Sequence, residues 1–397
     1  MATADPTPDI IASPAESPVG SLLVMIAAMP AEQLASLLSH LSTLFPSQSL
    51  IVAAPEEVPA DTYPALRMVA TPAPKLAMTL TAADFASAHQ LAEQHDAQAI
   101  LMMGPESGSL SGDVVRKLAT AVLSASTDLA IPCYDLPPNA GLVNSAILYP
   151  LSRGLFSCGA RFPLAIDLGL SRRMAEKLAR SSQRFAATSQ SDSLVWPVNE
   201  AAVAGFQIHE IDAGTRTLPQ PTDPDINAIL AHVTGSLFAD VDAKASFWQR
   251  PRRPVPSRVS HGVHSQADTL PDIAPMFEAF RLAYTNLREI WSLVLPPNSL
   301  LGLKHLSLLD PSAFRMPESL WARIVFDFLL AYRLRTLNRG HLLGALIPLY
   351  LAWVASHINI TASGTDPERH IEAVAAAFET EKPYLVSRWR WPDRFNP

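Results

Sequence analysis

The first half of the chain alternates short apolar runs with stretches of helical periodicity. The apolar runs are Leu22–Ala28, Leu50–Ala54, Leu66–Ala70, Ala99–Met103 and Leu129–Cys133. Apolar residues recur at helical spacing between them, in Ala31–Leu44, Thr81–Gln94 and Asp113–Ser124. Strands separated by helices need crossover connections, so this pattern predicts an α/β domain with a mostly parallel, Rossmann-like sheet.

The second half of the chain is dominated by helical spacing. A helix and a strand are predicted within Ser193–Ile211, and a further helix is predicted over Asp225–Phe238. Later helices are predicted at Pro275–Leu295, Leu320–Leu337, His341–Ile358 and His370–Trp389. These patterns predict a disordered tail at 1–19, an α/β domain at 20–250, a Pro/Arg-rich linker at 251–272 and an all-α domain at 273–390.

Composition narrows the classes of function. Of the 397 residues, 48% are apolar and 17% are charged, so the chain can bury sizeable cores, and its length favours two domains. The formal net charge of −7 argues against a nucleic-acid partner, because phosphate binding needs a positive face. The two cysteines, Cys133 and Cys158, make neither a disulfide framework nor a zinc motif. The acidic, proline-rich start does not resemble a signal peptide, and a cytoplasmic location is expected.

One apolar segment, Gly340–Ile360, raises the question of a membrane span. It contains His341, Pro348 and His357, and it barely reaches the ~20 residues that a spanning helix needs. We therefore predict a buried helix of a bundle and no membrane span.

The stretch Asn144–Met174 carries the most informative chemical pattern. It predicts a helix, a basic turn with glycines, an apolar segment that ends at Asp167, and a new helix that opens at Ser171. An acid at this point lies where α/β proteins place ligand-binding groups. Two interpretations of Asp167 stay open: an acid that binds a ligand, or a carboxylate favoured by the dipole of the following helix. No GxGxxG or GxxxxGK[ST] follows a predicted strand, so neither a dinucleotide site nor a P-loop is predicted.

Motifs in the helical part extend this pattern. They are Phe314-Arg-Met-Pro-Glu-Ser-Leu-Trp, Leu337-Asn-Arg-Gly-His, Pro348-Leu-Tyr-Leu and Lys382-Pro-Tyr-Leu-Val-Ser-Arg-Trp. Together with Asn144–Met174 they resemble the glucosylglycerate and mannosylglycerate synthase-like glycosyltransferases, over roughly residues 20–390. The resemblance implies a GT-A nucleotide-sugar domain followed by a helical domain. It also implies transfer of a sugar from a nucleotide donor to a small acid, with retention and with a divalent metal.

The positions that would bind the donor depart from that family. The first predicted strand ends in Ala-Ala-Met29-Pro30 in place of a Pro-Ser-Tyr-Asn type turn, and the second lacks the family's Asp before Glu56. A Gly-Lys-Gly type turn is replaced by Thr81-Ala-Ala-Asp-Phe. The metal-binding Asp-x-Asp motif is replaced by Gly-Pro-Glu106, so Glu106 is the one acid left there.

The remaining metal positions also differ. The string Asp223-Pro-Asp225 lies in a loop where the family itself has an Asp-Pro, and it is not expected to bind metal. Asp240 and Asp242 lie on a predicted helix, where residues i and i+2 point to different sides. The family's metal histidine has no counterpart before Asp223, while Arg216 takes the place of a basic residue. No metal site is therefore predicted.

Two further motifs supply the candidate site residues. Trp196-Pro-Val-Asn199 replaces Trp-Gly-Thr-Asp, so Asn199 keeps an acceptor oxygen and loses the charge and any base function. Pro-Leu-Ala-Ile-Asp167 replaces Pro-x-Gly-Gly-Asp, which keeps the acid and loses glycines that let a sugar approach the backbone. The catalytic candidates are Asp167 and Asn199. The substrate-binding candidates are Asp167, Glu106, Arg216 and Trp196.

Three functions are consistent with the sequence. The first is a glycosyltransferase-like protein with lost or weakened transfer, which acts as a binding or assembly subunit. Its partners would be a nucleotide-sugar, a second copy of the chain or an intact relative, and no cofactor is predicted. The second is an active, metal-independent transferase that uses Asp167 and backbone amides. The third is a helical interaction protein with no sugar ligand.

Overall fold

The computed structural model describes most of the chain. It covers residues 21–27, 29–45, 50–54, 63–64, 66–71, 79–104, 107–124, 126–186, 193–216, 226–253, 255–256 and 271–391. The predicted tail at 1–19 and most of the predicted linker lie outside the described residues. So do Glu106, Asp223 and Asp225.

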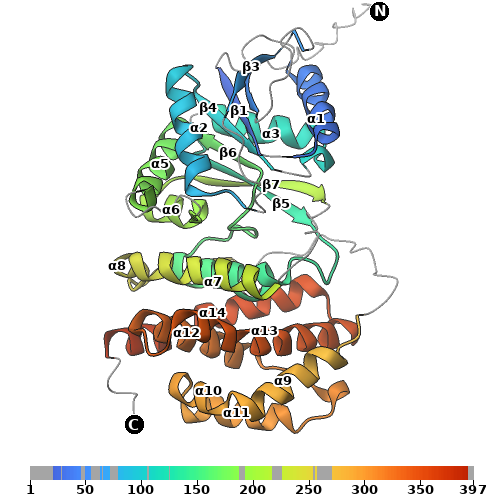
Figure 1. The fold of residues 1–397 in the computed structure, drawn as a ribbon, viewed down its shortest axis with the longest axis vertical. Coiled ribbons are helices and arrows are strands. Elements are labelled where there is room, and N and C mark those ends of the chain that lie inside the picture. The colour runs from blue at the N-terminus through green and yellow to red at the C-terminus, as the bar shows by residue number, and fades with distance from the viewer. Residues whose placement is uncertain are drawn as a thin grey trace, which may run out of the picture.

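Within the described residues, seven strands form one sheet (Figure 1). They are β1 (Leu22–Ile26), β2 (Leu50–Ala54), β3 (Arg67–Ala70), β4 (Ala99–Met103), β5 (Leu129–Asp135), β6 (Leu168–Ser171) and β7 (Ile208–Thr215). Their order in the sheet is β3-β2-β1-β4-β6-β5-β7. Only β6 runs antiparallel to its neighbours, β4 and β5. The prediction of a mostly parallel sheet is confirmed.

Helices cover both faces of this sheet. Leu23 and Met25 of β1 pack in one core with α2 (Ala82–Gln94) and α5 (Arg172–Ala186). Leu22 and Val24 of the same strand pack in the opposite core, with helices α1 (Ala31–Leu44) and α3 (Gly112–Leu123). Because both of their faces are buried, β1, β2 and β4 are apolar at every position, which is why apolar runs mark them in the sequence.

The short strand β6 corrects one prediction. A helix was expected to follow Asp167 closely, and α5 does begin at Arg172, but Leu168–Ser171 pair with β4 and β5 first. This strand has a glycine and a serine among its few residues, so it shows no apolar run. Asp167 therefore precedes a strand, and its interpretation as a carboxylate at a helix N-terminus is wrong.

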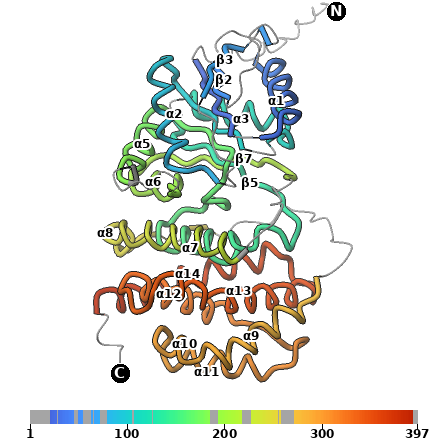
Figure 2. Tube along the Cα trace, in the orientation of Figure 1, coloured from blue at the N-terminus to red at the C-terminus, as the bar shows by residue number. Residues whose placement is uncertain are grey.

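Helices stack in layers beside one end of the sheet (Figures 1 and 2). They are α7 (Ile226–Ala243), α8 (Ala245–Trp248), α9 (Ala274–Asn286), α10 (Arg288–Val294), α11 (Pro297–Ser307), α12 (Glu318–Leu334), α13 (Arg339–Ala362) and α14 (Pro367–Arg390). The layer of α7 and α8 lies between the sheet and α12–α14, and α9–α11 lie on the far side. The predicted all-α part is confirmed, except that the single helix expected over Pro275–Leu295 is two helices, α9 and α10.

One apolar core joins segments that are far apart in the sequence. It contains Leu142 and the apolar side chains of two adjoining segments, the π-helical η3 (Asn144–Leu148) and α4 (Tyr149–Phe156). It also contains side chains of α7 and α8, and these pack with α9–α14. The limits 20–250 and 273–390 stay predictions. The packing shows that three segments before residue 250, at 142–156, 194–196 and 230–248, contribute to the core of the helical layers.

Helix α13 is the apolar segment that raised the membrane question. Among the described residues, it alone is long and apolar enough to cross a membrane. Its most apolar window is 67% buried inside the protein, and it packs against α7, α9, α12 and α14. The prediction of a buried bundle helix is confirmed.

The contact between α4 and α14 depends on the absence of a side chain at Gly154. A Cβ at this position would lie 3.1 Å from Phe378 Cβ and 3.3 Å from the Phe378 carbonyl oxygen. We expect Gly154→Ala to lower the free energy of unfolding by about 1–3 kcal/mol, because the backbone of α14 must move. Urea unfolding measures this. Gly344→Ala in α13 is the control, since a Cβ there meets nothing within 4 Å, and it should stabilise by about 0.5–1 kcal/mol. Equal effects of the two changes would contradict the close contact.

Candidate functional site

Four groups from four strands meet at one edge of the sheet. Gly104 follows β4, Tyr134 lies near the end of β5, Arg216 follows β7 and Asp167 precedes β6. Parallel strands end at the same edge, and β6 begins there because it runs in the opposite direction. Ligands of open α/β sheets bind beyond the carboxyl ends of the strands. This edge is therefore the candidate functional site.

The carboxylate of Asp167 is fully buried and surrounded by donors. Its Oδ1 accepts a hydrogen bond from the Gly104 backbone N–H at 2.9 Å. Its Oδ2 accepts one from the Tyr134 hydroxyl at 2.9 Å and lies 2.6 Å from Arg216 Nη1. The Arg216 guanidinium is also buried and lies 5.0 Å from the centroid of the Tyr134 ring. The charge of the acid is thus neutralised inside the protein.

Burial shifts the proton affinities of this cluster. It raises the pKa of Asp167, while the Arg216 charge, the Gly104 N–H and the Tyr134 hydroxyl act in the opposite direction. Burial also raises the pKa of Tyr134 well above its ordinary value, and the charge of Asp167 adds to this effect. The phenol of Tyr134 therefore stays protonated at neutral pH and serves as a hydrogen-bond donor.

The side chain of Ile166 covers the backbone at the end of β4. A Cβ placed on Gly104 would lie 2.1 Å from Ile166 Cγ2 and 2.9 Å from Ile166 Cβ. The family that the sequence resembles has a glycine at the position of Ile166. The isoleucine fills the space next to Asp167 that a glycine would leave open.

Asn199 and Trp196 belong to a different set of contacts, between α6 (Pro197–Ala204) and α7. Asn199 is fully buried, and its amide donates to Asp240 Oδ2 at 2.9 Å. The indole N–H of Trp196 donates to the Ser236 hydroxyl at 3.1 Å, and the ring is part of the apolar core. Of the predicted site residues, the structure brings Asp167 and Arg216 together. It places Asn199 and Trp196 against α7 instead.

The acids of α7 do not converge on one point. Asp240 contacts Lys244 and Asn199, whereas Asp242 lies 3.7 Å from Arg333. This agrees with the expectation that residues i and i+2 point to different sides. In the part of the chain that the structure describes, no group of three or more His, Cys, Asp or Glu could hold a metal ion.

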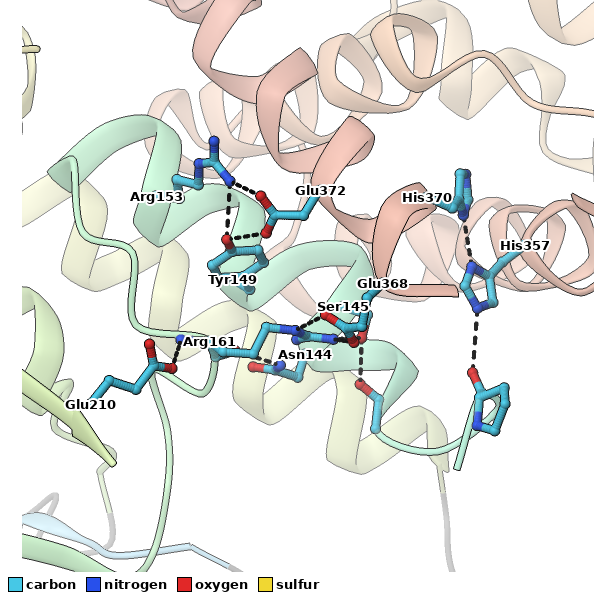
Figure 3. A network of polar contacts seen from close by, with 12 residues as sticks. Asn144, Ser145, Tyr149, Arg153, Arg161, Glu210, His357, Glu368, His370 and Glu372 are labelled. Carbon is cyan, nitrogen blue, oxygen red and sulfur yellow. Dashed lines mark hydrogen bonds and ion pairs between the residues drawn. The ribbon is translucent and has the colours of Figure 1, made fainter. Parts of the chain in front are cut away.

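A second polar network joins α4, whose apolar side chains pack in the core of the helical layers, to α14 (Figure 3). Arg153 of α4 is buried, and it donates to Glu372 at 2.6 Å and to Glu379 at 3.2 Å, both on α14. The Tyr149 hydroxyl donates to Glu372 at 2.6 Å and accepts from Arg153 at 3.1 Å. These bonds hold α4 against α14 at a point where both are surrounded by apolar side chains.

Arg161 makes a similar connection at the start of α14. Its Nε and Nη2 donate to the two carboxylate oxygens of Glu368 at 3.0 and 2.9 Å, and Nη2 also donates to the Ser145 hydroxyl at 3.0 Å. The guanidinium lies 5.2 Å from the Tyr149 ring centroid and 5.0 Å from that of Phe162. A bidentate pair stacked on two rings has a fixed geometry.

His357 of α13 and His370 of α14 form the third connection (Figure 3). Their Nδ1 atoms are 2.7 Å apart, and His357 Nε2 lies 3.3 Å from the Pro138 carbonyl oxygen. A carbonyl only accepts, so His357 carries its proton on Nε2 and accepts through Nδ1 from His370. Burial lowers the pKa of each histidine to about 4, and the neighbouring ring contributes for His357. Both rings are therefore neutral at pH 7.

The partners in this network could not be identified from the sequence. Arg153 and Arg161 stand in an apolar stretch, which is a signal that each must find a carboxylate, since arginine is rarely buried alone. Their partners Glu372 and Glu368 follow 219 and 207 residues later. Charge and spacing alone do not select them from the other acids.

Comparisons with known proteins give a similarity of fold. No protein-family model matches the chain, and no curated protein matches its sequence. Glucosyl-3-phosphoglycerate synthase from Mycobacterium tuberculosis, solved with Mn²⁺, UDP-glucose and phosphoglyceric acid, is similar at 14% identity and a TM-score of 0.38. The match covers 60% of this chain and 88% of that one. Mannosyl-3-phosphoglycerate synthase from Rubrobacter xylanophilus is similar at 12% identity and a TM-score of 0.36, over 60% and 79% of the two chains. A similarity of this extent carries no information on donor, acceptor or activity.

The buried pair of Asp167 and Arg216 makes a prediction about stability. Asp167→Asn removes the negative charge that Arg216 faces, and we expect it to lower the free energy of unfolding by about 3–5 kcal/mol. The double change Asp167→Asn with Arg216→Met should cost less than the sum of the single changes. Asp96→Asn is the control, because its carboxylate is 88% exposed in a surface pair with Arg172 and should contribute little. Urea unfolding measures the wild type, both single variants, the double variant and the control. A small effect of Asp167→Asn would contradict a structural role.

The histidine pair makes a prediction about pH. The folded-state pKa values of about 4 lie below the unfolded value of about 6.5, so the unfolded chain takes up protons first on acidification. The stability that depends on the neutral pair is complete above about pH 6.5 and is lost as the pH falls towards 4. At about pH 5 we expect a loss of about 2 kcal/mol for each histidine. Urea unfolding of the wild type and of the His357→Gln, His370→Gln double variant measures it. Equal losses of unfolding free energy on acidification in the wild type and in the double variant would contradict the prediction.

Proposed function

We propose that this chain is a glycosyltransferase-like protein whose transfer chemistry is lost or much weakened, and that it works as a binding or assembly subunit. The observation that carries the proposal is the closed edge of the sheet. Ile166 lies against Gly104, and both oxygens of Asp167 are engaged by Gly104, Tyr134 and Arg216. An acid that is neutralised within the protein is a poor base or sugar ligand.

The proposal extends to partners and location. A nucleotide-sugar is the ligand that the sequence resemblance suggests, and a second copy of the chain or an intact relative is the protein partner. The cytoplasm is the proposed compartment, which agrees with the absence of a disulfide between Cys133 and Cys158.

The experiment is calorimetric titration and turnover on the same protein preparation. UDP-glucose and GDP-mannose are titrated with and without Mg²⁺ or Mn²⁺, and release of the nucleoside diphosphate is followed with D-glycerate as acceptor. We expect no turnover above the protein-free reaction, and binding that the metal does not strengthen, because Glu106 is the one acid left in the place of the Asp-x-Asp motif. Light scattering of the same sample measures whether the chain self-associates.

Other results would select another function. Turnover that does not need metal would favour an active, metal-independent transferase. Turnover that needs metal would overturn the proposal altogether. No heat with any nucleotide-sugar would favour a helical interaction protein without a sugar ligand.

A further inference from the structure

One nitrogen of the Arg161 guanidinium makes no hydrogen bond to the described residues. The side chain is 5% exposed, and its Nη1 is buried without a hydrogen-bond partner among the described residues. The other two nitrogens bind Glu368 and Ser145. Buried donors in folded proteins are nearly always paired, so this arginine has binding capacity beyond the ion pair that it makes.

Arg161 lines a small cavity between the end of β5 and the start of α14. The cavity has a volume of about 10 Å³, which is room for about one water molecule. Its walls include Tyr134, Pro138, Ala140, Ser145, Pro367 and Glu368. A ligand of several atoms can enter only when one of these side chains moves.

The N-terminus of α14 lies at the same cavity. Pro367 and Glu368 are the first residues of this helix of 24 residues. The start of a helix carries partial positive charge and backbone N–H groups without partners in the helix. An arginine fork beside a helix N-terminus makes an anion site, and the anion bound to the fork here is the carboxylate of Glu368. The Ser145 hydroxyl accepts a hydrogen bond from Arg161 Nη2 and so holds the fork in place.

Glu368 is the member of this site that can move. Its side chain is 30% exposed, whereas that of Arg161 is 5% exposed and is held between the rings of Tyr149 and Phe162. A rotation of Glu368 into solvent therefore leaves the arginine fork in place. It also enlarges the cavity that Arg161 and Glu368 line.

We propose that Arg161, which Ser145 holds in place, and the N-terminus of α14 bind the carboxylate or phosphate group of a small molecule, and that the Glu368 carboxylate occupies this site when the ligand is absent. The ligand competes with the Glu368 carboxylate for the same donors. The proposal does not rest on sugar transfer. The proposed site touches the Asp167 cluster through Tyr134, which lines the cavity and donates to Asp167.

The test compares the full-length wild type with Glu368→Gln in titrations with inorganic phosphate and with acetate. The change removes the competing charge and keeps the size of the side chain, so the apparent Kd for at least one of the two anions should fall by about tenfold or more. Glu379→Gln is the matched control, because it removes a carboxylate of the same helix that binds Arg153 and not Arg161. Chloride at equal ionic strength controls for screening.

Two further variants test whether the tighter anion binding of Glu368→Gln occurs at Arg161. In the Glu368→Gln background, Arg161→Lys should abolish the tighter binding and Ser145→Ala should weaken it, with circular dichroism as the check on folding. Where the lysine variant does not fold, the serine variant gives the same readout. An affinity of Glu368→Gln no higher than that of Glu379→Gln would show that Arg161 and Glu368 are only a structural pair, and would overturn the proposal.

Discussion

The buried carboxylate of Asp167 determines the arrangement of one whole edge of the sheet. A charge in a dry interior is tolerated only when it is paired and hydrogen-bonded. Here the required donors come from the ends of three other strands, through Gly104, Tyr134 and Arg216. The strands can therefore end only where these donors converge. The same requirement brings Ile166, the neighbour of Asp167, against the backbone of Gly104.

The sequence predicts the elements better than the contacts between them. Strands buried on both faces are visible as apolar runs, and amphipathic helices are visible as periodic ones, so the α/β sheet and the helical part could be predicted. Strand β6 could not, because Leu168–Ser171 is short and owes its conformation to pairing with β4 and β5. The importance of Asp167 was predicted from its place before an element boundary. Arg216 was also a predicted site residue, but its ion pair with Asp167 could not be predicted. That pair depends on the register of β5 against β7, which shifts between Cys133 and Tyr134.

The contact between the α/β half and the helical layers also depends on buried polar groups that need distant partners. Its arginine ion pairs and the His357 contact join an early segment, Asn144–Arg161 or the loop at Pro138, to α13 or α14. Burying arginines and histidines costs free energy, and the cost is recovered only when the distant partners are in place. Such contacts make the helical layers and the sheet half depend on each other, although the sequence suggests two separable domains.

Helix α13 has a consequence for how the chain is made. A helix that resembles a membrane span must find its protein partners before other apolar surfaces capture it. During synthesis, the N-terminal parts of a chain emerge first. Helices α7, α9 and α12 all precede α13 and pack against it, while α14 alone follows. When α13 is synthesised, the helices that form most of its binding groove have therefore already been made. A chain that ends before residue 339 lacks α13 and would leave the apolar surface of that groove exposed.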